Sequence, residues 1–127
     1  MPLDRPLALT QGDPAGIGPD ITLAAWLRRK EHGIAPFLFV GDPEVLAARA
    51  RLLGLDVPLD ETDAAGAVAA FPDRLPVHPI TAGAVVAAGE PHVATARGTI
   101  AAIETATALA LDRIAAAVVT NPIAKSI

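Results

Sequence analysis

The chain has 127 residues, a formal net charge of −4, 52% hydrophobic residues and 3% aromatic residues. This apolar content argues against a disordered chain, which has too little apolar surface to bury. The acidic balance and the scarce aromatic residues argue against nucleic-acid binding, which uses basic patches and stacking rings. The absence of cysteine excludes disulfides, thiolate metal sites and thiol nucleophiles.

The first part of the chain alternates short apolar runs with helical patterns. Residues 7–10 and 37–40 predict buried strands, the second of them buried on both faces. Residues 11–19 carry three glycines and two prolines, and they predict a loop. A helix is expected from Asp20 to shortly before Gly33. One face of this helix holds Ile21, Ala24, Ala25 and Arg28.

A second helix has clear start and stop signals. Asp42 suits the N-cap, Pro43 suits the first helical position, and the helix is expected to run to Leu53 and end at Gly54. Strands and helices thus alternate with short connections. This order predicts an α/β fold with an open, mostly parallel sheet and helices on both faces.

The middle of the chain is less regular. Residues 57–59 predict a short strand, and residues 62–71 are weakly patterned. Residues 74–80 contain two prolines and predict at most an edge strand, because proline cannot donate to a sheet ladder. Residues 81–91 predict a loop.

A long helix over about residues 93–111 and a strand over residues 116–119 complete the pattern. The turn Thr120-Asn121-Pro122 ends that strand. The helix is expected to bury a stripe of Ala96, Ile100, Ile103, Ala110 and, beyond its end, Ile114. The large core anchors are expected to be Trp26, Phe37, Phe39 and Phe71.

The glycine-rich turn after the first strand is the first candidate site. Ligands of open parallel sheets bind beyond the carboxyl ends of strands, where Gly12, Asp13, Gly16 and Gly18 fall. Glycines there let the backbone approach a ligand, and a helix start favours anions. The spacing is neither G-x-G-x-x-G nor a phosphate-binding loop. The alternative is a tight turn whose glycines serve backbone geometry, with Asp13 as a cap.

The turn after the last strand is the second candidate site. Thr120 and Asn121 offer hydrogen bonds, and Lys125 offers a point charge for a carboxylate or phosphate. If the two strands are neighbours, both turns line one crevice. The alternative is an ordinary turn with a solvated lysine.

No catalytic residue and no metal ligand is assigned within residues 1–127. The three histidines lack the spacing of a helical metal pair, and His32 is expected to end the first helix. The three histidines are His32, His78 and His92. A cluster of three acidic residues, Asp60, Glu61 and Asp63, is expected to lie in a solvated loop.

The sequence shows neither a signal peptide nor a membrane span. The N-terminus lacks a long apolar core, and the alanine-rich residues 105–119 are interrupted by Asp112 and Arg113. A soluble cytoplasmic protein without membrane partners is therefore expected.

Two stretches carry a family resemblance. Residues 10–20, TQGDPAGIGPD, and residues 118–125, VVTNPIAK, resemble motifs of the 4-hydroxythreonine-4-phosphate dehydrogenases. Turns at residues 41–43 and 89–91 also resemble turns of that family. The similarity covers the entire chain, but the family's proteins are longer. Residues 1–127 are therefore identified as the N-terminal part of a two-domain enzyme of this family.

The resemblance implies an NAD-dependent oxidation of 4-phosphooxy-threonine, a phosphorylated small molecule, to a 3-oxo acid. Decarboxylation follows on the route to pyridoxal phosphate. Family members are homodimers, with a divalent metal (zinc, magnesium or cobalt) held by three histidines. These histidines, a His-Thr pair and the phosphate-binding residues are expected beyond Ile127, so the fragment alone is expected to be inactive.

The first motif is also similar to the G-D-G-I-G-P-E turn of isocitrate and isopropylmalate dehydrogenases, which lies near the dinucleotide. This likeness puts the Gly12 to Gly18 turn on the cofactor side of the cleft. It also implies that the fold is related to that of isocitrate and isopropylmalate dehydrogenases, and that residues 1–127 contain only part of it. Two alternatives stay open. One is a related metal-dependent decarboxylating hydroxyacid dehydrogenase, and the other is a small non-catalytic α/β domain that binds a partner.

Overall fold

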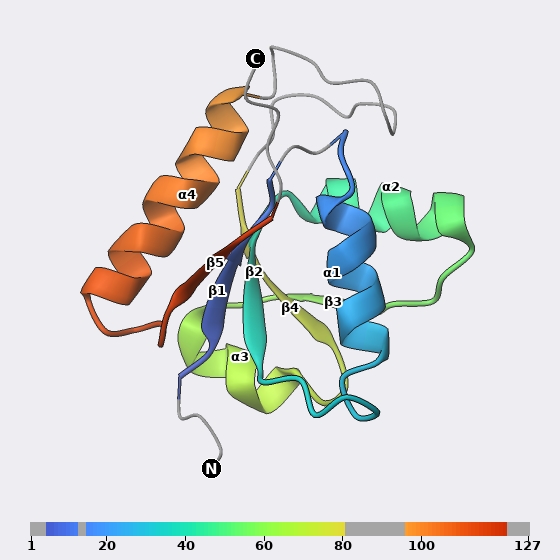
Figure 1. Cartoon of the computed structure of the whole chain (residues 1–127), viewed down its shortest axis with the longest axis horizontal. Helices are drawn as coiled ribbons and strands as arrows, with labels where there is room; N and C mark the ends of the chain where they lie inside the picture. Colours follow the sequence, from blue (N-terminus) through green and yellow to red (C-terminus); the bar gives the residue numbers. More distant parts are fainter. Residues whose placement is uncertain (1–4, 13–14, 81–95, 122–127) are drawn as a thin grey trace.

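The computed structural model describes residues 5–12, 15–80 and 96–121 of the chain. Within these residues five strands form one sheet in the order β3-β4-β2-β1-β5, with every neighbouring pair parallel (Figure 1). The predicted α/β fold with an open parallel sheet is confirmed. The elements are β1 (Leu7–Thr10), α1 (Gly18–Leu27), β2 (Phe37–Gly41), α2 (Pro43–Leu53), β3 (Leu59–Glu61), α3 (Ala64–Ala70), β4 (Leu75–Pro79), α4 (Ala96–Leu111) and β5 (Val118–Thr120).

The sheet is covered on both faces. Helices α1 and α2 pack with Phe37 and Phe39 of β2, while α3 and α4 pack with Leu38 and Val40 of the same strand. Successive side chains of a strand point to opposite faces, so β2 contributes to both layers. All five residues of β2 are buried, as predicted for a central strand.

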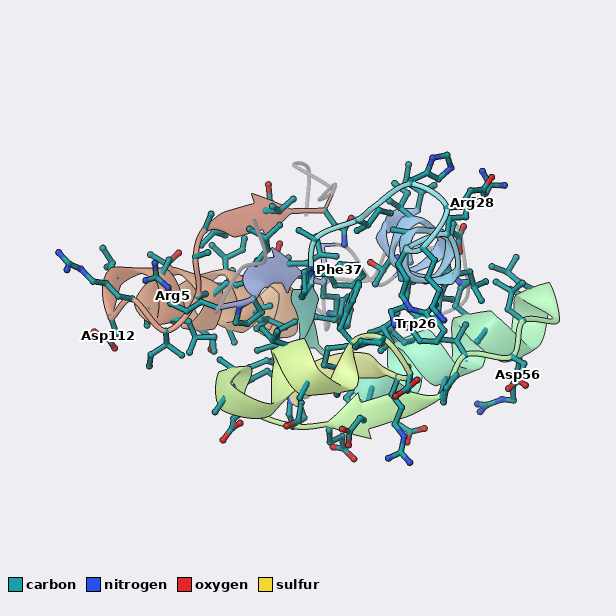
Figure 2. The ribbon with its side chains drawn as sticks, turned by 90° about the horizontal axis from the view of Figure 1, so that it is seen from below. Arg5, Trp26, Arg28, Phe37, Asp56 and Asp112 are labelled. Atoms are coloured by element: carbon teal, nitrogen blue, oxygen red, sulfur yellow. The ribbon has the colours of Figure 1, made fainter. Side chains whose placement is uncertain are left out.

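Aromatic residues anchor the layer under α1 and α2. The rings of Phe37 and Phe71 meet edge to face with centroids 4.9 Å apart, and Trp26 Nε1 donates to the carbonyl oxygen of Phe71 at 2.9 Å. Phe39 is fully buried. Figure 2 shows Trp26 and Phe37 pointing into the space between the helices and the sheet. The predicted anchors are confirmed.

Local signals also set the bounds of α2. The Asp42 side chain accepts a hydrogen bond from the Glu44 amide at 2.9 Å, and Pro43 follows as the first helical residue. Gly54 ends the helix with φ of 69°, a left-handed conformation that glycine adopts without strain. The predicted helix and both of its caps are confirmed.

The prediction that residues 74–80 form at most an edge strand was wrong. Strand β4 lies inside the sheet between β3 and β2. Its prolines fall where no ladder donor is needed. Pro76 comes before the first residue pair of β4 with β2, which is Val77 with Phe39. The next residue after Pro79, Ile80, donates its backbone amide to the carbonyl oxygen of Gly41 in β2 at 2.8 Å, so the nitrogen of Pro79 points to the other side. Pro79 therefore faces β3, which has already ended.

Residues 57–71 also differ from the expectation. The short strand begins at Leu59 and not at Val57, and the weakly patterned stretch contains the helix α3. The expected acidic loop was wrong because Asp60 and Glu61 lie in β3. Asp63 is the N-cap of α3 and accepts from the Gly66 amide at 3.0 Å.

The buried face of α4 was predicted wrongly. Ala102 and Ala106 are fully buried, whereas Ile100 is 55% exposed and Ile114 is also exposed. Small side chains let the helix approach Ala8 and Val40 of the sheet closely, so alanines and not isoleucines form the contact. The predicted end of this helix at Leu111 is confirmed. Residues 93–95 lie outside the described residues.

Helix α1 is shorter than expected. It begins at Gly18 and ends at Leu27, so His32 lies in the turns that follow and not at the helix end. Gly33 is left-handed, with φ of 59°, within those turns. The predicted loop at 81–91 lies outside the described residues. Among the described residues, no helix is long and apolar enough to cross a membrane.

Candidate active-site edge

The carboxyl ends of β1, β2 and β5 meet at one edge of the sheet (Figure 1). Parallel pairing brings Thr10 of β1 beside Val40 of β2 on one side and beside Thr120 of β5 on the other. The glycine-rich turn leaves from β1 and the Asn121 turn leaves from β5. Both turns therefore start at neighbouring strand ends.

Asn121 joins these strand ends to α1. Its side chain is buried, and Nδ2 donates to the carbonyl oxygen of Thr10 at 2.9 Å and to Thr22 Oγ1 at 3.0 Å. The Thr22 hydroxyl in turn donates to the carbonyl oxygen of Gly18 at 2.8 Å. Asparagine suits this position because one amide nitrogen carries two donors. The chain of bonds ties β5, β1 and the first turn of α1 together.

Gly18 allows this close approach. A Cβ at Gly18 would lie 2.7 Å from the Gln11 carbonyl oxygen, closer than real Cβ atoms come, and 3.0 Å from Asn121 Cβ. The hydrogen that replaces a side chain thus faces protein atoms. At Gly18 the glycine serves the packing of α1 against the strand ends.

Gln11 connects β1 to β2. Its backbone amide donates to the carbonyl oxygen of Val40 at 3.1 Å, and its side-chain Oε1 accepts from the Asp42 amide at 2.7 Å. Gly41 makes room, because a Cβ there would lie 2.6 Å from Gln11 Cβ. A buried glutamine therefore fixes the β2–α2 turn relative to the glycine-rich turn.

Arg49 of α2 holds the start of α1. Its side chain is 5% exposed, and Nη1 donates to Asp20 Oδ1 at 2.6 Å and to the carbonyl oxygen of Gly16 at 2.9 Å. The carboxylate of Asp20 also lies in the first turn of its helix, where negative charge is favoured. One cation thus fixes both the turn and the helix that follows it.

Gly12 begins the glycine-rich turn with φ of 72°. Only glycine adopts this region at little cost, so its position is a backbone requirement. Its carbonyl oxygen accepts from Thr99 Oγ1 of α4 at 3.2 Å. Helices on both faces of the sheet, α1 and α4, therefore reach this turn.

Two buried polar atoms at the same edge, Thr10 Oγ1 and Gln11 Nε2, have no hydrogen-bond partner among the residues that the structure describes. Such atoms are uncommon in a folded interior because an unmade hydrogen bond costs free energy. Among the described residues, no group of three His, Cys, Asp or Glu side chains is arranged to hold a metal ion. The described edge thus contains buried hydrogen-bonding groups together with the ion pair of Arg49 and Asp20.

The predicted site residues are thus only partly described. Gly12, Gly16, Gly18, Thr120 and Asn121 all lie at this edge: Thr120 ends β5, Gly18 begins α1, and the other three follow the neighbouring strands β1 and β5. Asp13 and Lys125 lie outside the described residues, as does His92. His78 lies in β4, half-buried, opposite Val40. A role in cofactor binding stays a prediction for each of the seven residues.

Sequence reasoning missed three residues that organise this edge: Gln11, Thr22 and Arg49. Gln11 lies within the first motif and precedes its first glycine, which was a usable signal. Thr22 and Arg49 gave none, because their partners are 99 and 33 residues away along the chain.

The fold and this edge define a class of protein, an open parallel α/β domain with glycine- and asparagine-bearing turns at adjacent strand ends. The family model described as pyridoxal phosphate biosynthetic protein PdxA matches residues 33–127. The chain therefore belongs to the PdxA family.

Individual relatives agree with this family. A 4-hydroxythreonine-4-phosphate dehydrogenase of Methylorubrum extorquens is 52% identical over 124 residues, which are 96% of this chain and 36% of that protein. The enzyme of the same name from Xanthobacter autotrophicus is 50% identical over 122 residues, 96% of this chain and 35% of that protein. The chain thus spans little more than a third of the length of these relatives.

Solved structures share the fold. The crystal structure of 4-hydroxythreonine-4-phosphate dehydrogenase from Klebsiella pneumoniae has a TM-score of 0.76 at 28% identity, covering 95% of this chain and 38% of that chain. The Burkholderia phymatum structure of the same name has a TM-score of 0.82 at 15% identity, covering 98% and 38%. At that identity the likeness shows the fold alone.

Proposed function

We propose that this chain is the N-terminal part of a two-domain 4-hydroxythreonine-4-phosphate dehydrogenase. The complete enzyme oxidises the hydroxyl of 4-phosphooxy-threonine with NAD, and the resulting 3-oxo acid loses carbon dioxide on the route to pyridoxal phosphate. It works as a homodimer in the cytoplasm. Family membership and the names of relatives up to 52% identical support this proposal.

The observation that carries the proposal is the Asn121 side chain, bonded to Thr10 of β1 and Thr22 of α1. It joins the end of β5 to the end of β1 and to the first turn of α1, the two elements that flank the glycine-rich turn. This is the carboxyl edge of the sheet, where ligands of open α/β folds bind. In the proposal, Gly12, Gly16, Gly18, Thr120 and Asn121 form one wall of the cleft on the cofactor side. Asp13 and Lys125 belong to the same wall.

The chain's own residues have an orienting role in this proposal. Bound NAD would supply the hydride acceptor for the oxidation. Backbone groups of the glycine-rich turn would lie against the cofactor, and Arg49 would keep that turn in position through the Gly16 carbonyl oxygen at 2.9 Å. A turn held by a buried cation and a buried amide is preorganised, which lowers the ordering cost of binding.

The proposal assigns no catalytic side chain and no metal ligand to this chain. The described residues do not fit a metal site, because no three ligand-type side chains gather among them. As the family resemblance implies, the divalent metal of the complete enzyme, whether zinc, magnesium or cobalt, would be held by histidines from the rest of the polypeptide. The 127-residue chain alone is then inactive.

An NADH absorbance assay tests this assignment. The 127-residue chain with NAD, 4-phosphooxy-threonine and zinc or magnesium should give no turnover. A chimera in which this chain replaces the matched part of the Methylorubrum extorquens relative should oxidise the substrate and produce NADH. The intact relative serves as the positive control.

Two results would contradict the proposal. Turnover by the 127-residue chain alone would show that it supplies a complete site. A folded chimera that oxidises isocitrate or isopropylmalate but not 4-phosphooxy-threonine would indicate a related hydroxyacid dehydrogenase.

A further inference from the structure

The first turn of α4 lies over the end of β1, on the face of the sheet opposite α1. Figure 1 shows α4 beginning at the edge where β1 and β5 end. Ala8 of β1 packs against Ala102 and Ala106 in the middle of the helix. Nearer the helix start, Thr99 Oγ1 donates to the carbonyl oxygen of Gly12 at 3.2 Å. The start of α4 therefore covers the last residues of β1.

Thr10 points toward this first turn. Alternate side chains of a strand share a face, so Thr10 lies on the same side of β1 as Ala8. Thr10 is fully buried, between Ala8 and Gly12 along the chain. Its hydroxyl oxygen Oγ1 has no hydrogen-bond partner among the residues that the structure describes. Because buried hydroxyls are normally paired, a donor left free under a helix start indicates a missing acceptor.

Thr120 of β5 places a second hydroxyl beside the first. Thr120 pairs with Thr10 in the parallel register, and Val118, two residues earlier, packs on the α4 side of the sheet. Thr120 therefore faces the α4 side as well. Neighbouring strands are about 4.8 Å apart, so the oxygens of one small ligand group can reach both hydroxyls. Thr120 is exposed, which gives a ligand access from solvent.

The electrostatics of this place favour a negatively charged ligand. The first N–H groups of a helix point out of its start, where the helix dipole adds partial positive charge. The first turn of α4 holds no acidic residue. Gly98 lies in that turn and has no side chain to keep a ligand from the backbone. Amides and hydroxyls can all donate to the oxygens of a phosphate.

We propose that the start of α4, together with the hydroxyls of Thr10 and Thr120, is a binding site for a phosphate group. The site does not depend on the proposed dehydrogenase activity. Which phosphate occupies it does rest on the proposed function, because NAD carries a diphosphate and 4-phosphooxy-threonine carries a phosphate.

The unpartnered Thr10 hydroxyl gives the proposal a signature in stability. A buried polar group without a partner costs free energy, so a residue kept for a ligand is one whose removal stabilises the free protein. Thr10→Val exchanges the hydroxyl for a methyl group of similar size. It should raise the urea concentration at the midpoint of unfolding and weaken phosphate binding. A threonine with a purely structural role would not show these opposite effects.

Titration with inorganic phosphate, followed by NMR of the backbone amides, tests the site in the 127-residue chain and in the chimera. The amide resonances of Gly98 and Thr99 should shift with phosphate and stay in place with chloride at equal ionic strength. Thr10→Val and Thr120→Val should each raise the dissociation constant for phosphate about tenfold, the effect of losing one hydrogen bond to a charged group.

Thr107 provides the matched control on the same helix. Its hydroxyl is exposed and donates to the carbonyl oxygen of Ile103 at 2.8 Å, within α4 and away from the helix start. Thr107→Val should therefore leave the dissociation constant for phosphate unchanged.

The chimera identifies the source of the phosphate. NADH fluorescence measures cofactor binding, and equilibrium dialysis measures the binding of 4-phosphooxy-threonine. Thr10→Val should weaken the binding of one of these two ligands about tenfold and leave the other unchanged. The weakened ligand is the one whose phosphate occupies the site. A chimera that oxidises neither compound would contradict the proposed function, whereas the phosphate titration would still report on the site.

Three results would overturn the proposal. One is the absence of phosphate-dependent shifts at Gly98 and Thr99 in both proteins. Another is a lower urea midpoint for Thr10→Val in the chimera with no change in phosphate binding, which would assign the hydroxyl to a structural contact. The third is phosphate binding in the chimera while Thr10→Val weakens neither NADH nor 4-phosphooxy-threonine, which would mean an adventitious ion only.

Discussion

Single hydrogen-bonding side chains hold the carboxyl edge of the sheet together. Asn121, Gln11 and Arg49 are all buried, and each reaches a backbone atom of another element. A strand end or a turn offers unpaired backbone groups, and a buried group of this kind needs a partner. These side chains supply the partners, so they fix the relative positions of the turns.

Replacing Asn121 tests this role. Asn121→Leu removes two donated bonds and leaves the Thr10 carbonyl oxygen without its partner in a buried position. The free energy of unfolding should fall by about 1–3 kcal/mol, the usual cost of leaving a buried polar group unsatisfied. Urea unfolding followed by the fluorescence of Trp26, the only tryptophan, measures it.

The neighbouring residue provides the control for this change. Thr120 is exposed, so Thr120→Val should change the free energy of unfolding by less than about 0.5 kcal/mol. An Asn121→Leu variant as stable as the parent chain would show that the two bonds contribute nothing net to folding.

At the scale of elements, the structure separates what neighbouring residues decide from what distant contacts decide. The bounds of α2 follow from Asp42, Pro43 and Gly54, whose effects act within one turn of helix, and sequence alone was sufficient for them. The buried face of α4 depends on how near the helix comes to the sheet. Sequence alone selected Ile100, whereas the close contact is made by Ala102.

The position of β4 and the network at the candidate site depend on distant contacts even more strongly. A proline is excluded from an inner strand only where its nitrogen would have to donate a hydrogen bond to the neighbouring strand. Which residues of the neighbouring strand lie opposite it cannot be read from the sequence. The sequence placed both the Asn121 turn and the glycine-rich turn at carboxyl ends of strands. That these strands, β5 and β1, are neighbours depends on the strand order, and neither this order nor the bonds to Thr22 and from Arg49 could be predicted from sequence.

Arg49 links two helices, and its loss should loosen both. Arg49→Leu removes the bonds to Asp20 and Gly16, and should lower the free energy of unfolding by about 1–3 kcal/mol, since Asp20 is partly exposed and regains water. Urea unfolding measures the change. Arg49→Lys should recover only part of it: both bonds come from the single nitrogen Nη1, and a lysine ammonium also has several donors, but its shorter side chain places them less far from α2.

Helix α2 offers a matched control in Arg51, which is exposed. Arg51→Leu should leave the free energy of unfolding within about 0.5 kcal/mol of the parent value. If Arg49→Leu and Arg51→Leu lowered the free energy of unfolding equally, the bonds to Asp20 and Gly16 would not account for the loss.

Across the whole molecule, the two sides of the sheet are built differently. The α1 and α2 side contains large side chains, among them Phe37, Phe39 and Trp26, while the α4 contact consists of alanines and valine. Strand β2 lies at the centre of the order, paired on both edges and buried on both faces. Strand β5 is an edge strand among the described residues and has exposed side chains.

This arrangement predicts a gradient of local stability across the sheet. Backbone amides open either by local fluctuation or by global unfolding, and central buried strands open by the global route. The amide of Val40 in β2 should therefore exchange at the rate set by global unfolding, and that of Val119 in β5 at least about tenfold faster. NMR-detected hydrogen exchange on the 127-residue chain measures both. Equal rates would mean that β5 unfolds only with the whole domain, and that its single paired edge is enough to hold it.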